Sequence, residues 1–376
     1  MRCCACFPHS LPKSMREQVT GSAMVPKIVS AAALAGAAMA TCPLSVQITS
    51  TAGHVAQVGV TNTAEDAVTV FKGNTVLLDH PTMDLQVSDV LGRALPFKGA
   101  FVQYKQTGIA PEMFQTIKPG QTVYASVNAA SSYKLLGVRQ AVISAVQGFN
   151  YVMGTAAPTS LADTEFCQAT SNSMTIIPDQ SKAAIDHLST RNTPAFNSRI
   201  AKRDIAYYNC SLSQTSDLKK SVDHAISMSK GAGPAATSSL DYFTTWFKST
   251  SVADKVEGIY TRITGVQRTS PTISCSDTYS YCGDGTALLY TIPSENYIVP
   301  CPNNGFWRFP ELASTCADDD YDRAGSILHE ISHLYGTLDY AYGQAAAMNL
   351  SADQAAANAD TYEIYAGSVR LGGCRS

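Results

Sequence analysis

The chain has 376 residues, of which 45% are hydrophobic and 15% charged, so it is long enough for two globular domains with separate cores. Its formal net charge of −3 at pH 7 gives no reason to expect a nucleic acid or an anionic membrane as a partner. The charge is uneven, however. Residues 204–376 hold 11 Lys and Arg against 19 Asp and Glu, whereas residues 1–203 hold 16 against 11.

Residues 24–40 have the build of a secretory signal peptide. Lys27 precedes a short, Ala-rich apolar run that ends in the small-x-small sequence Ala38-Met39-Ala40. This run is too short to span a bilayer, and no other stretch comes close to the roughly 18 apolar residues of a membrane helix. We therefore expect a secreted, extracellular protein that starts at Met24, with residues 1–23 an over-extended N-terminus.

Cysteine usage agrees with export. Eight cysteines follow Ala40, and an even number in a signal-bearing chain is typical of disulfides. Two lie before residue 203 and six after it, so each half can close its own bridges. The eight are Cys42, Cys167, Cys210, Cys275, Cys282, Cys301, Cys316 and Cys374.

A dibasic pair, Lys202-Arg203, lies in a polar stretch at the point where charge balance and cysteine number change. The coincidence predicts proteolytic cleavage there. Residues 41–203 would then be a propeptide and residues 204–376 a mature, monomeric domain.

The predicted propeptide is rich in β-strand patterns. Four segments alternate apolar and polar residues between turn-forming residues, which predicts a small sandwich of short strands. They are residues 44–51, 56–63, 67–73 and 122–129. A helical or coil segment, 178–191, leads to the dibasic pair.

The predicted mature domain carries mostly helix signals. Apolar positions at helical spacing and flanking Gly residues predict helices. These are 211–233 (with a stop at Gly231 and Gly233), 238–249, 251–263, 316–336 (with Gly336 as stop) and 343–367. Residues 275–301 switch to strand composition in "ALLYTIPSENYIVPC". The fold class is therefore α+β, a mostly helical mature domain with a small sheet after a β-rich propeptide.

One predicted helix carries the sequence "HEISH", an H-E-x-x-H motif. Residues four apart project from the same side of a helix, so His329 and His333 can both bind one zinc ion. Glu330 can then take a proton from a zinc-activated water, which has a pKa near 7. The motif predicts a metal-dependent hydrolase.

A catalytic zinc usually has three protein ligands, and the residues leave two candidates for the third. Asp339 follows Gly336, which can end the helix and turn the chain back towards the metal. Glu363 lies 30 residues after His333 in a predicted helix, as the third ligand does in the Glu-zincin arrangement.

"HEISH" followed by "GTLDYAYG" resembles the H-E-x-x-H and G-T-x-D-x-x-Y-G signature of the deuterolysin family, the aspzincins, which are secreted fungal zinc endopeptidases with a zincin-like fold. The segments "YTIPSENYIVPCP" and "NADTYE" are also similar to the family, so the likeness covers the mature region. It implies zinc on His329, His333 and Asp339, with Glu330 as general base and acid. Tyr342 would donate its hydroxyl to the oxyanion.

The resemblance implies further roles. Thr337 would orient the ligand Asp339, and Asp360 and Glu363 would be acidic residues near the primed-side substrate pocket. It also implies sequential disulfides, Cys210 with Cys275, Cys282 with Cys301 and Cys316 with Cys374. One departure stands out: only "LYGTL" separates His333 from Asp339, fewer residues than the family usually has, so this loop must turn more tightly.

We therefore predict a zinc metalloendopeptidase made as a zymogen, with one Zn²⁺ per mature domain and protein or peptide substrates. The acidic mature half favours basic stretches in them. The propeptide would be an intramolecular inhibitor or folding aid. The alternatives are a Glu-zincin-like peptidase with Glu363 as ligand, a disulfide-rich secreted effector or binding protein with an inactive site, and a structural zinc site closed by four ligands.

Overall fold

The computed structural model describes residues 42–189, 204–238, 240–283, 285–315 and 321–373. The chain divides into two compact units, Met1–Ala40 and Thr41–Ser376, and only the second contains described residues. The predicted signal segment and the predicted cleavage site at Lys202-Arg203 lie outside the described residues. Among the residues that are described, no helix combines the length and apolarity needed to cross a membrane.

The first part of the second unit consists mainly of strands, as the alternating segments predicted. In β1 (Leu44–Ala52), Leu44, Val46 and Ile48 are buried while the residues between them are exposed. The other predicted strands are confirmed as β2 (Val55–Asn62), β3 (Val68–Phe71) and β7 (Thr122–Asn128). Seven more strands are β4 (Gln86–Ser88), β5 (Phe101–Tyr104), β6 (Phe114–Ile117), β8 (Ala141–Ser144), β9 (Val146–Met153), β10 (Glu165–Thr170) and β11 (Met174–Ile176).

All of these strands except β5 form three antiparallel sheets around one apolar core. Their orders are β1-β2-β7, β10-β9-β3-β6 and β11-β8-β4. Side chains such as Ile48, Val60 and Phe149 meet between them. A disulfide, Cys42–Cys167, ties the start of this region to β10. Two helices, α1 (Ala129–Ser132) and α2 (Gln180–Ser189), complete it, and α2 confirms the helical alternative for 178–191.

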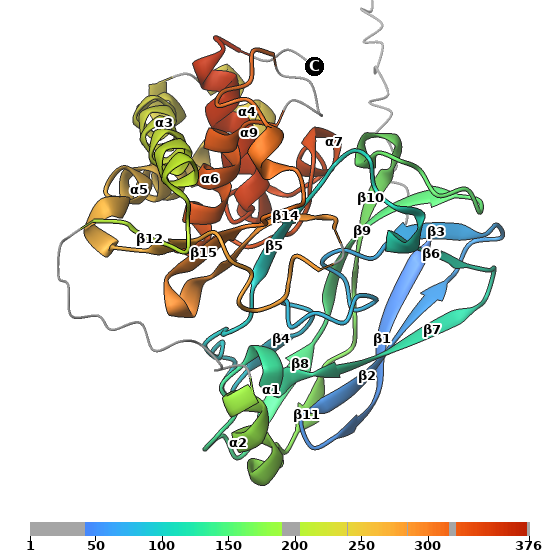
Figure 1. Ribbon diagram of the computed structural model, residues 1–376. Coiled ribbons are helices and arrows are strands. Elements are labelled where there is room, and N and C mark those ends of the chain that lie inside the picture. Colours follow the sequence, from blue (N-terminus) through green and yellow to red (C-terminus); the bar gives the residue numbers. More distant parts are fainter. Residues whose placement is uncertain (1–41, 190–203, 239, 284, 316–320, 374–376) are drawn as a thin grey trace, which may run out of the picture. The chain divides into compact units, whose positions relative to one another are not determined.

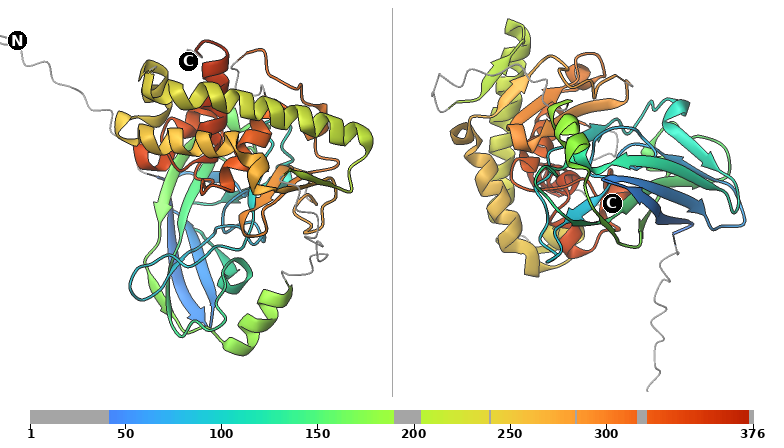
Figure 2. Two further views of the ribbon diagram at one scale, coloured as in Figure 1. Left: turned by 90° about the vertical axis from the view of Figure 1, so that its left-hand side faces the viewer. Right: turned by 90° about the horizontal axis from the view of Figure 1, so that it is seen from below.

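The second part is dominated by helices. Four of its helices, α3, α5, α6 and α9, pack on one another beside the sheet that contains β14 (Ala287–Ile292) and β15 (Tyr297–Pro300) (Figures 1 and 2). Within the described residues, the helices of this part are α3 (Leu212–Ser238), α4 (Leu240–Phe247), α5 (Ala253–Thr264), α6 (Arg323–His333), α7 (Gln344–Ala347), α8 (Ala352–Ala355) and α9 (Ala359–Arg370). Short 3₁₀ turns are η1 (Pro111–Met113), η2 (Leu161–Asp163), η3 (Thr250–Val252), η4 (Val266–Thr269), η5 (Pro293–Glu295) and η6 (Phe306–Arg308).

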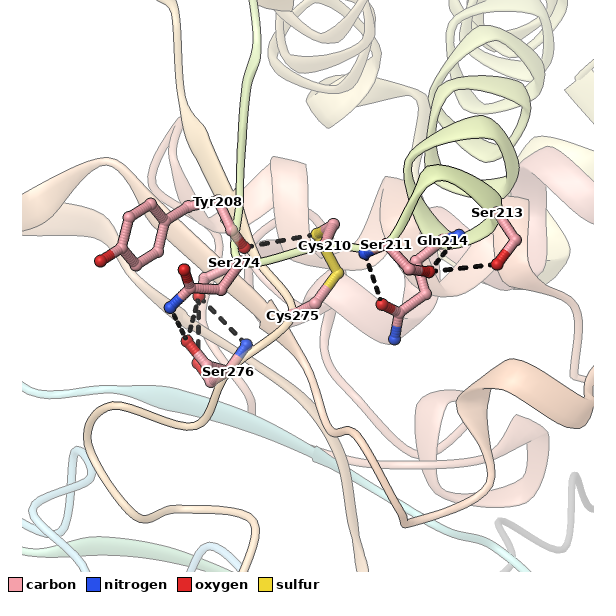
Figure 3. Close-up of a disulfide and its surroundings, with 9 residues drawn as sticks. Tyr208, Cys210, Ser211, Ser213, Gln214, Ser274, Cys275 and Ser276 are labelled. Carbon is pink, nitrogen blue, oxygen red and sulfur yellow. Dashed lines mark hydrogen bonds between the residues drawn. A yellow bond between two sulfur atoms is a disulfide. The ribbon is translucent and has the colours of Figure 1, made fainter.

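The start of α3 is fixed by local hydrogen bonds and a disulfide (Figure 3). Ser211 N–H donates to Gln214 Oε1 at 2.9 Å and Gln214 N–H donates to Ser211 Oγ at 3.2 Å, which is a capping box. The disulfide Cys210–Cys275 joins this end of the helix to the end of β13 (Thr272–Ser274). A second disulfide, Cys282–Cys301, also has the pairing that the resemblance implied, whereas Cys316 and Cys374 lie outside the described residues.

Three predicted helices have other bounds in the structure. The helix predicted over 316–336 is α6, which runs only from Arg323 to His333, because Asp322 is its N-cap and Leu334 its C-cap. The predicted stop at Gly231 and Gly233 is absent, because α3 continues through Pro234 to Ser238. A Cβ on Gly233 would lie 3.3 Å from Tyr260 Cβ, so this glycine permits the close approach of α5 rather than ending α3.

The segment 343–367 was also expected to be helical almost throughout. It breaks into α7, α8 and α9. A capping box between Ser351 and Gln354 starts α8, and Asn358 is the N-cap residue of α9. The side chains of Ser351 and Gln354 therefore cap a helix start within this Ala-rich stretch, whereas the Asn358 side chain makes no capping hydrogen bond to α9.

A five-stranded sheet joins the two parts of the unit. Its order is β12 (Ala206–Tyr208), β13 (Thr272–Ser274), β15 (Tyr297–Pro300), β14 (Ala287–Ile292) and β5. The strands β12, β13 and β15 are parallel, while β14 runs antiparallel to both β15 and β5. The prediction of strands in 275–301 is confirmed. The edge strand β5 comes from the first part of the chain, which the sequence did not indicate (Figure 1). With these helices and sheets, the fold is α+β.

Candidate metal centre and active site

The motif residues lie on the buried face of α6. Asp322 caps this helix, because its carboxylate accepts hydrogen bonds from Gly325 N–H at 2.5 Å and Ala313 N–H at 2.7 Å. His329, Glu330 and His333 are almost completely buried. The helical spacing of four residues brings the two imidazoles together, with ring centroids 5.0 Å apart.

The short loop after α6 turns Asp339 back towards the two histidines. Gly336 has a φ of +100°, a conformation that residues with a side chain rarely adopt. Leu338 N–H then donates to Ala357 O at 2.7 Å, and Ala359 N–H donates to Leu338 O at 2.9 Å. A glycine turn and this bridge to the start of α9 thus allow the five-residue connection that the sequence left in question.

Three ligand atoms converge where a metal would bind. Asp339 Oδ1 lies 3.3 Å from Nε2 of His329 and 3.3 Å from Nε2 of His333. Tetrahedral zinc with bonds of about 2.0–2.2 Å needs its ligand atoms roughly 3.3 Å apart. All three atoms are buried, and among the described residues none of them makes a hydrogen bond. Buried polar atoms are normally paired, so this set fits a zinc ion in both spacing and chemistry.

The second ring nitrogen of His333 is held by the loop. Nδ1 lies 3.0 Å from the carbonyl oxygen of Thr337, and because a carbonyl only accepts, Nδ1 must carry the proton. Nε2 is then left with its lone pair for a metal. Thr337 Oγ1 also lies 2.6 Å from Ser332 Oγ and 3.3 Å from His333 Nδ1. We expected Thr337 to orient Asp339, but these contacts direct it to His333 instead.

The second ring nitrogen of His329 faces two carboxylates. Nδ1 lies 3.6 Å from Asp360 Oδ1 and 3.5 Å from Glu363 Oε2, both on α9. The alternative with Glu363 as third zinc ligand is therefore not favoured, because Glu363 approaches the nitrogen that points away from His333. Both acidic residues line a cavity of about 80 Å³ beside the metal centre.

The burial of these charges shifts their pKa values in opposite directions. Burial raises the pKa of Glu330 to about 7, although the two neighbouring histidines oppose it. Burial also opposes ionisation of Asp339, but His333 and His329 outweigh it and hold the pKa of Asp339 well below its usual range. Asp339 is thus an ionised ligand candidate, while Glu330 is able to exchange a proton near neutral pH.

Tyr342 lies next to His329. Its ring lies parallel to that of His329, with centroids 6.1 Å apart. Its hydroxyl donates to the carbonyl oxygen of Val102 at 2.6 Å and also accepts from Asn74 Nδ2. Burial, reinforced by the nearby Asp339, raises the pKa of Tyr342 well above its usual value, so the hydroxyl keeps its proton.

The sequence did not indicate several residues that shape the site. Asn358, fully buried, accepts from Tyr340 N–H at 2.8 Å and Ala341 N–H at 3.1 Å and so fixes the loop after Asp339. Phe101 stacks on His333 with centroids 4.4 Å apart, and Gln103 Nε2 donates to Glu363 Oε2 at 2.7 Å. Asn358 occurs in the quoted "NAD", but neither Phe101 nor Gln103 belongs to any recognisable motif.

Known proteins are similar to this chain over most of its length. The model of the aspzincin family, described as lysine-specific metallo-endopeptidase, matches residues 232–367. A neutral protease 2 homologue of Sclerotinia sclerotiorum is 31% identical, covering 87% of this chain and 90% of its own. One from Botryotinia fuckeliana is 32% identical over 74% and 78% of the two chains, and one from Arthroderma gypseum is 28% identical over 91% and 95%.

These matches reach beyond the region that carries the motif. Residues 204–376 are less than half of the chain, so a match to 87% of it must include much of the strand-rich first part. The relatives therefore have a counterpart of that part as well as of the helical second part.

Proposed function

The chain belongs to the aspzincin family of zinc metalloendopeptidases, and from that premise we propose that it hydrolyses internal peptide bonds of proteins after secretion as a zymogen. The observation that carries the proposal is the convergence of two imidazole nitrogens on one carboxylate oxygen, each nitrogen 3.3 Å from that oxygen, with all three atoms buried and without hydrogen bonds in the described residues.

His329, His333 and Asp339 would hold one zinc ion. Bound there, zinc supplies a Lewis acid that polarises a carbonyl group and lowers the pKa of water to near 7. Thr337 would keep His333 in the tautomer that binds metal, through the hydrogen bond from Nδ1. His329 Nδ1 makes no hydrogen bond in the described residues, but the carboxylates of Asp360 and Glu363, 3.6 and 3.5 Å away, would favour a proton on that nitrogen and so leave Nε2 for the metal.

Glu330 would move the proton. Its carboxylate is buried next to both histidines, and its pKa of about 7 lets it take a proton from the attacking water and give it to the leaving amine. Tyr342 would donate its hydroxyl to the oxygen of the tetrahedral intermediate. Its present acceptor, the carbonyl oxygen of Val102, is a group of the kind that this role requires.

The substrate class follows from charge. Asp360 and Glu363 line the cavity beside the metal centre, so a basic side chain on the primed side of the substrate would find two carboxylates there. The excess of acidic residues in 204–376 points the same way. We infer that protein segments containing Lys or Arg are preferred.

The organisation of the precursor stays as the sequence predicted it. Residues 1–23 would be an over-extended N-terminus, 24–40 a signal peptide, 41–203 a propeptide removed after Lys202-Arg203, and 204–376 a monomeric mature enzyme. The relatives support the propeptide, because their similarity includes the strand-rich part.

The test is metal content and proteolysis of the secreted, processed protein. We expect one zinc per chain and casein hydrolysis that a chelator stops and zinc restores. Glu330→Gln should keep the zinc but lower the rate about 10²–10⁴-fold, the usual contribution of a general base. Asp339→Ala should lose the zinc.

Glu363→Gln is the matched control for Asp339→Ala. It should keep the zinc with an affinity lowered by about 10-fold or more, because the negative charge beside His329 Nδ1 is lost from the outer shell of the site. Loss of zinc from Glu363→Gln but not from Asp339→Ala would contradict the proposed ligands.

A further inference from the structure

The strand β5 occupies the edge of the sheet beside the metal centre. It pairs antiparallel with β14 in the register Thr291 to Phe101, Tyr290 to Val102 and Leu289 to Gln103. Lys105 N–H continues the ladder by donating to Thr286 O at 2.9 Å. Without β5, β14 would be an edge strand with unpaired backbone groups, which is where an extended peptide binds by strand addition.

One carbonyl group of β5 is held by the tyrosine that the proposed mechanism uses. Val102 O accepts from Tyr342 Oη at 2.6 Å and from Asn74 Nδ2 at 2.9 Å. If Tyr342 stabilises the oxygen of the peptide group under attack, the carbonyl that it now holds lies in the position of the scissile carbonyl. The bond between Val102 and Gln103 then corresponds to the bond that is cut in a substrate.

The side chain of Gln103, the residue after Val102, lies beside the carboxylate of Glu363. Gln103 is fully buried, and its Nε2 donates to Glu363 Oε2 at 2.7 Å. Its Oε1 has no hydrogen bond in the described part of the chain, which costs free energy and is not expected of a purely structural residue. Gln103 thus has the place of a primed-side substrate residue, but it brings a neutral amide instead of a positive charge.

The side chain of Phe101, the residue before Val102, covers one of the proposed metal ligands. The ring of Phe101 lies on that of His333 at a centroid distance of 4.4 Å and an interplanar angle of 13°. Phe101 and Gln103 are two residues apart on a strand, so both point to the side of α6 and α9. An aromatic ring and an amide therefore fill the space that a substrate and a water molecule would need.

We propose that residues 101–104 are a substrate-shaped inhibitory strand, in which Val102 and Gln103 take the places of the residues on either side of the scissile bond. This rests on the proposed function, because it assumes that His333, Tyr342 and Glu363 serve catalysis and substrate binding. The strand resists cleavage for two reasons. Its amide does not neutralise the acidic residues, and both of its ends stay anchored in the folded precursor, for instance through Ala100 N–H to Pro81 O at 3.2 Å.

The first experiment measures latency in the uncut chain. Lys202→Ser with Arg203→Ser blocks processing, and zinc content confirms that each variant is folded. We expect the uncut parent to hydrolyse casein far more slowly than the processed enzyme. Adding Phe101→Ala and Gln103→Ala should raise the rate of the uncut chain by at least about 10-fold, because a buried hydrogen bond and a ring contact are lost. Tyr124→Ala, at an exposed position of β7, should change nothing.

The second experiment tests the register without altering the folded chain. The blocked peptides GAFVQY (residues 99–104) and GAFVKY are added to the processed enzyme. GAFVQY should inhibit casein hydrolysis competitively. GAFVKY should be hydrolysed at least about 10-fold faster than GAFVQY, with water added across the Val–Lys bond alone, because a charged site discriminates against a neutral analogue.

The outcomes separate the two proposals. Cleavage of GAFVKY at another bond, equal latency of the Phe101 and Gln103 variant and its parent, or full activity of the uncut parent would each overturn the inhibitory strand. A zinc-loaded processed enzyme that does not cleave casein would instead overturn the proposed function, and the inhibitory strand with it.

Discussion

At the residue scale, the candidate site contains several buried polar atoms that make no hydrogen bond in the described residues. Nε2 of His329 and His333, both oxygens of Glu330 and both oxygens of Asp339 are buried without a hydrogen bond in the described residues. A buried polar group without a partner costs about 1–3 kcal/mol, so several at one place are retained only where a bound ion or a substrate repays the cost. This geometric signal is independent of the H-E-x-x-H pattern. Both lead to His329, Glu330 and His333, and the geometry adds Asp339.

A different buried carboxyl group lies in the predicted propeptide. Asp84 is 5% exposed, and its Oδ1 accepts a hydrogen bond from Thr82 Oγ1 at 2.9 Å. Burial raises its pKa to about 8, which Asp79 reinforces and the Thr82 hydrogen bond only partly offsets. Tyr133 and Tyr281 are also near, and both stay protonated because burial raises their pKa values as well.

The raised pKa makes stability depend on pH. Between about pH 4 and pH 8 the folded chain keeps the proton of Asp84 while the unfolded chain has lost it. Stability therefore falls as pH rises through this window, by roughly 1 kcal/mol per pH unit, and the dependence ends above the folded pKa.

We expect Asp84→Asn to flatten this slope and to be more stable than the parent at pH 8, because Asn is neutral at every pH. The measurement is the urea midpoint of the uncut chain at pH 5 and pH 8, with Glu330→Gln present to prevent self-digestion. Parallel loss of stability in both proteins would show that another group controls the dependence.

At the element scale, α6 and α9 must approach closely to place carboxylates behind a zinc ligand. A Cβ on Gly325 would lie 2.8 Å from Glu363 Oε1 and 3.0 Å from Asp322 Oδ1. The glycine therefore leaves the space in which Glu363 reaches His329 Nδ1. In α9, Gly367 has nothing within 4 Å of the same position, so it offers a matched control.

We expect Gly325→Ala to push Glu363 away from His329 and to lower zinc affinity by about 10-fold, the size of an outer-shell effect. Gly367→Ala should leave zinc binding unchanged and stabilise the chain by about 0.5–1 kcal/mol, the helix preference of Ala over Gly. Chelator competition gives the affinities and thermal unfolding the stabilities. Unchanged zinc affinity in Gly325→Ala would contradict a role for Glu363 behind His329.

Local patterns predicted elements well wherever local physics decides them. The alternation in 44–51 and the Asp-capped, apolar body of α6 are set by neighbours in sequence, and both were confirmed. The end of α3 was missed because Gly233 serves a contact with Tyr260, distant in sequence. The helical segment 343–367 was too long because Ser351 and Asn358 start new helices within it.

Some residues of the candidate site could likewise be predicted from local sequence patterns, and others could not. Helical spacing predicted His329, Glu330 and His333. The third ligand remained undecided between Asp339 and Glu363 until the resemblance favoured Asp339. The shortened loop was decided by the bridge between Leu338 and residues 357 and 359, which no local pattern contains. The contacts of Phe101 and Gln103 join positions more than 200 residues apart, so periodicity and spacing gave no access to them.

At the scale of the whole molecule, the two sides of the predicted cleavage site share a core. Val102 and Tyr104 from the first part pack with Tyr290, Val299 and Tyr342 from the second. The described disulfides, Cys42–Cys167, Cys210–Cys275 and Cys282–Cys301, each lie on one side of residue 203 and so do not link the two parts covalently. The described contacts that hold the parts together are therefore apolar burial, the ladder between β5 and β14, and side-chain hydrogen bonds such as those from Tyr342 to Val102 and from Gln103 to Glu363.

Cutting the chain at Lys202-Arg203 leaves all of these contacts in place. We expect a Glu330→Gln chain, cleaved in vitro by a dibasic-specific protease, to elute from gel filtration as one complex and to separate only in denaturant. An interface built like a protein core keeps its partners together once the connection is gone. Separate elution in native buffer would contradict this.

If the pieces do stay together, one cut does not suffice for activity, because β5 still lies along β14. Activation then requires a second event, either proteolysis within the bound propeptide or its unfolding, and the less stable state that Asp84 imposes above neutral pH would favour that release.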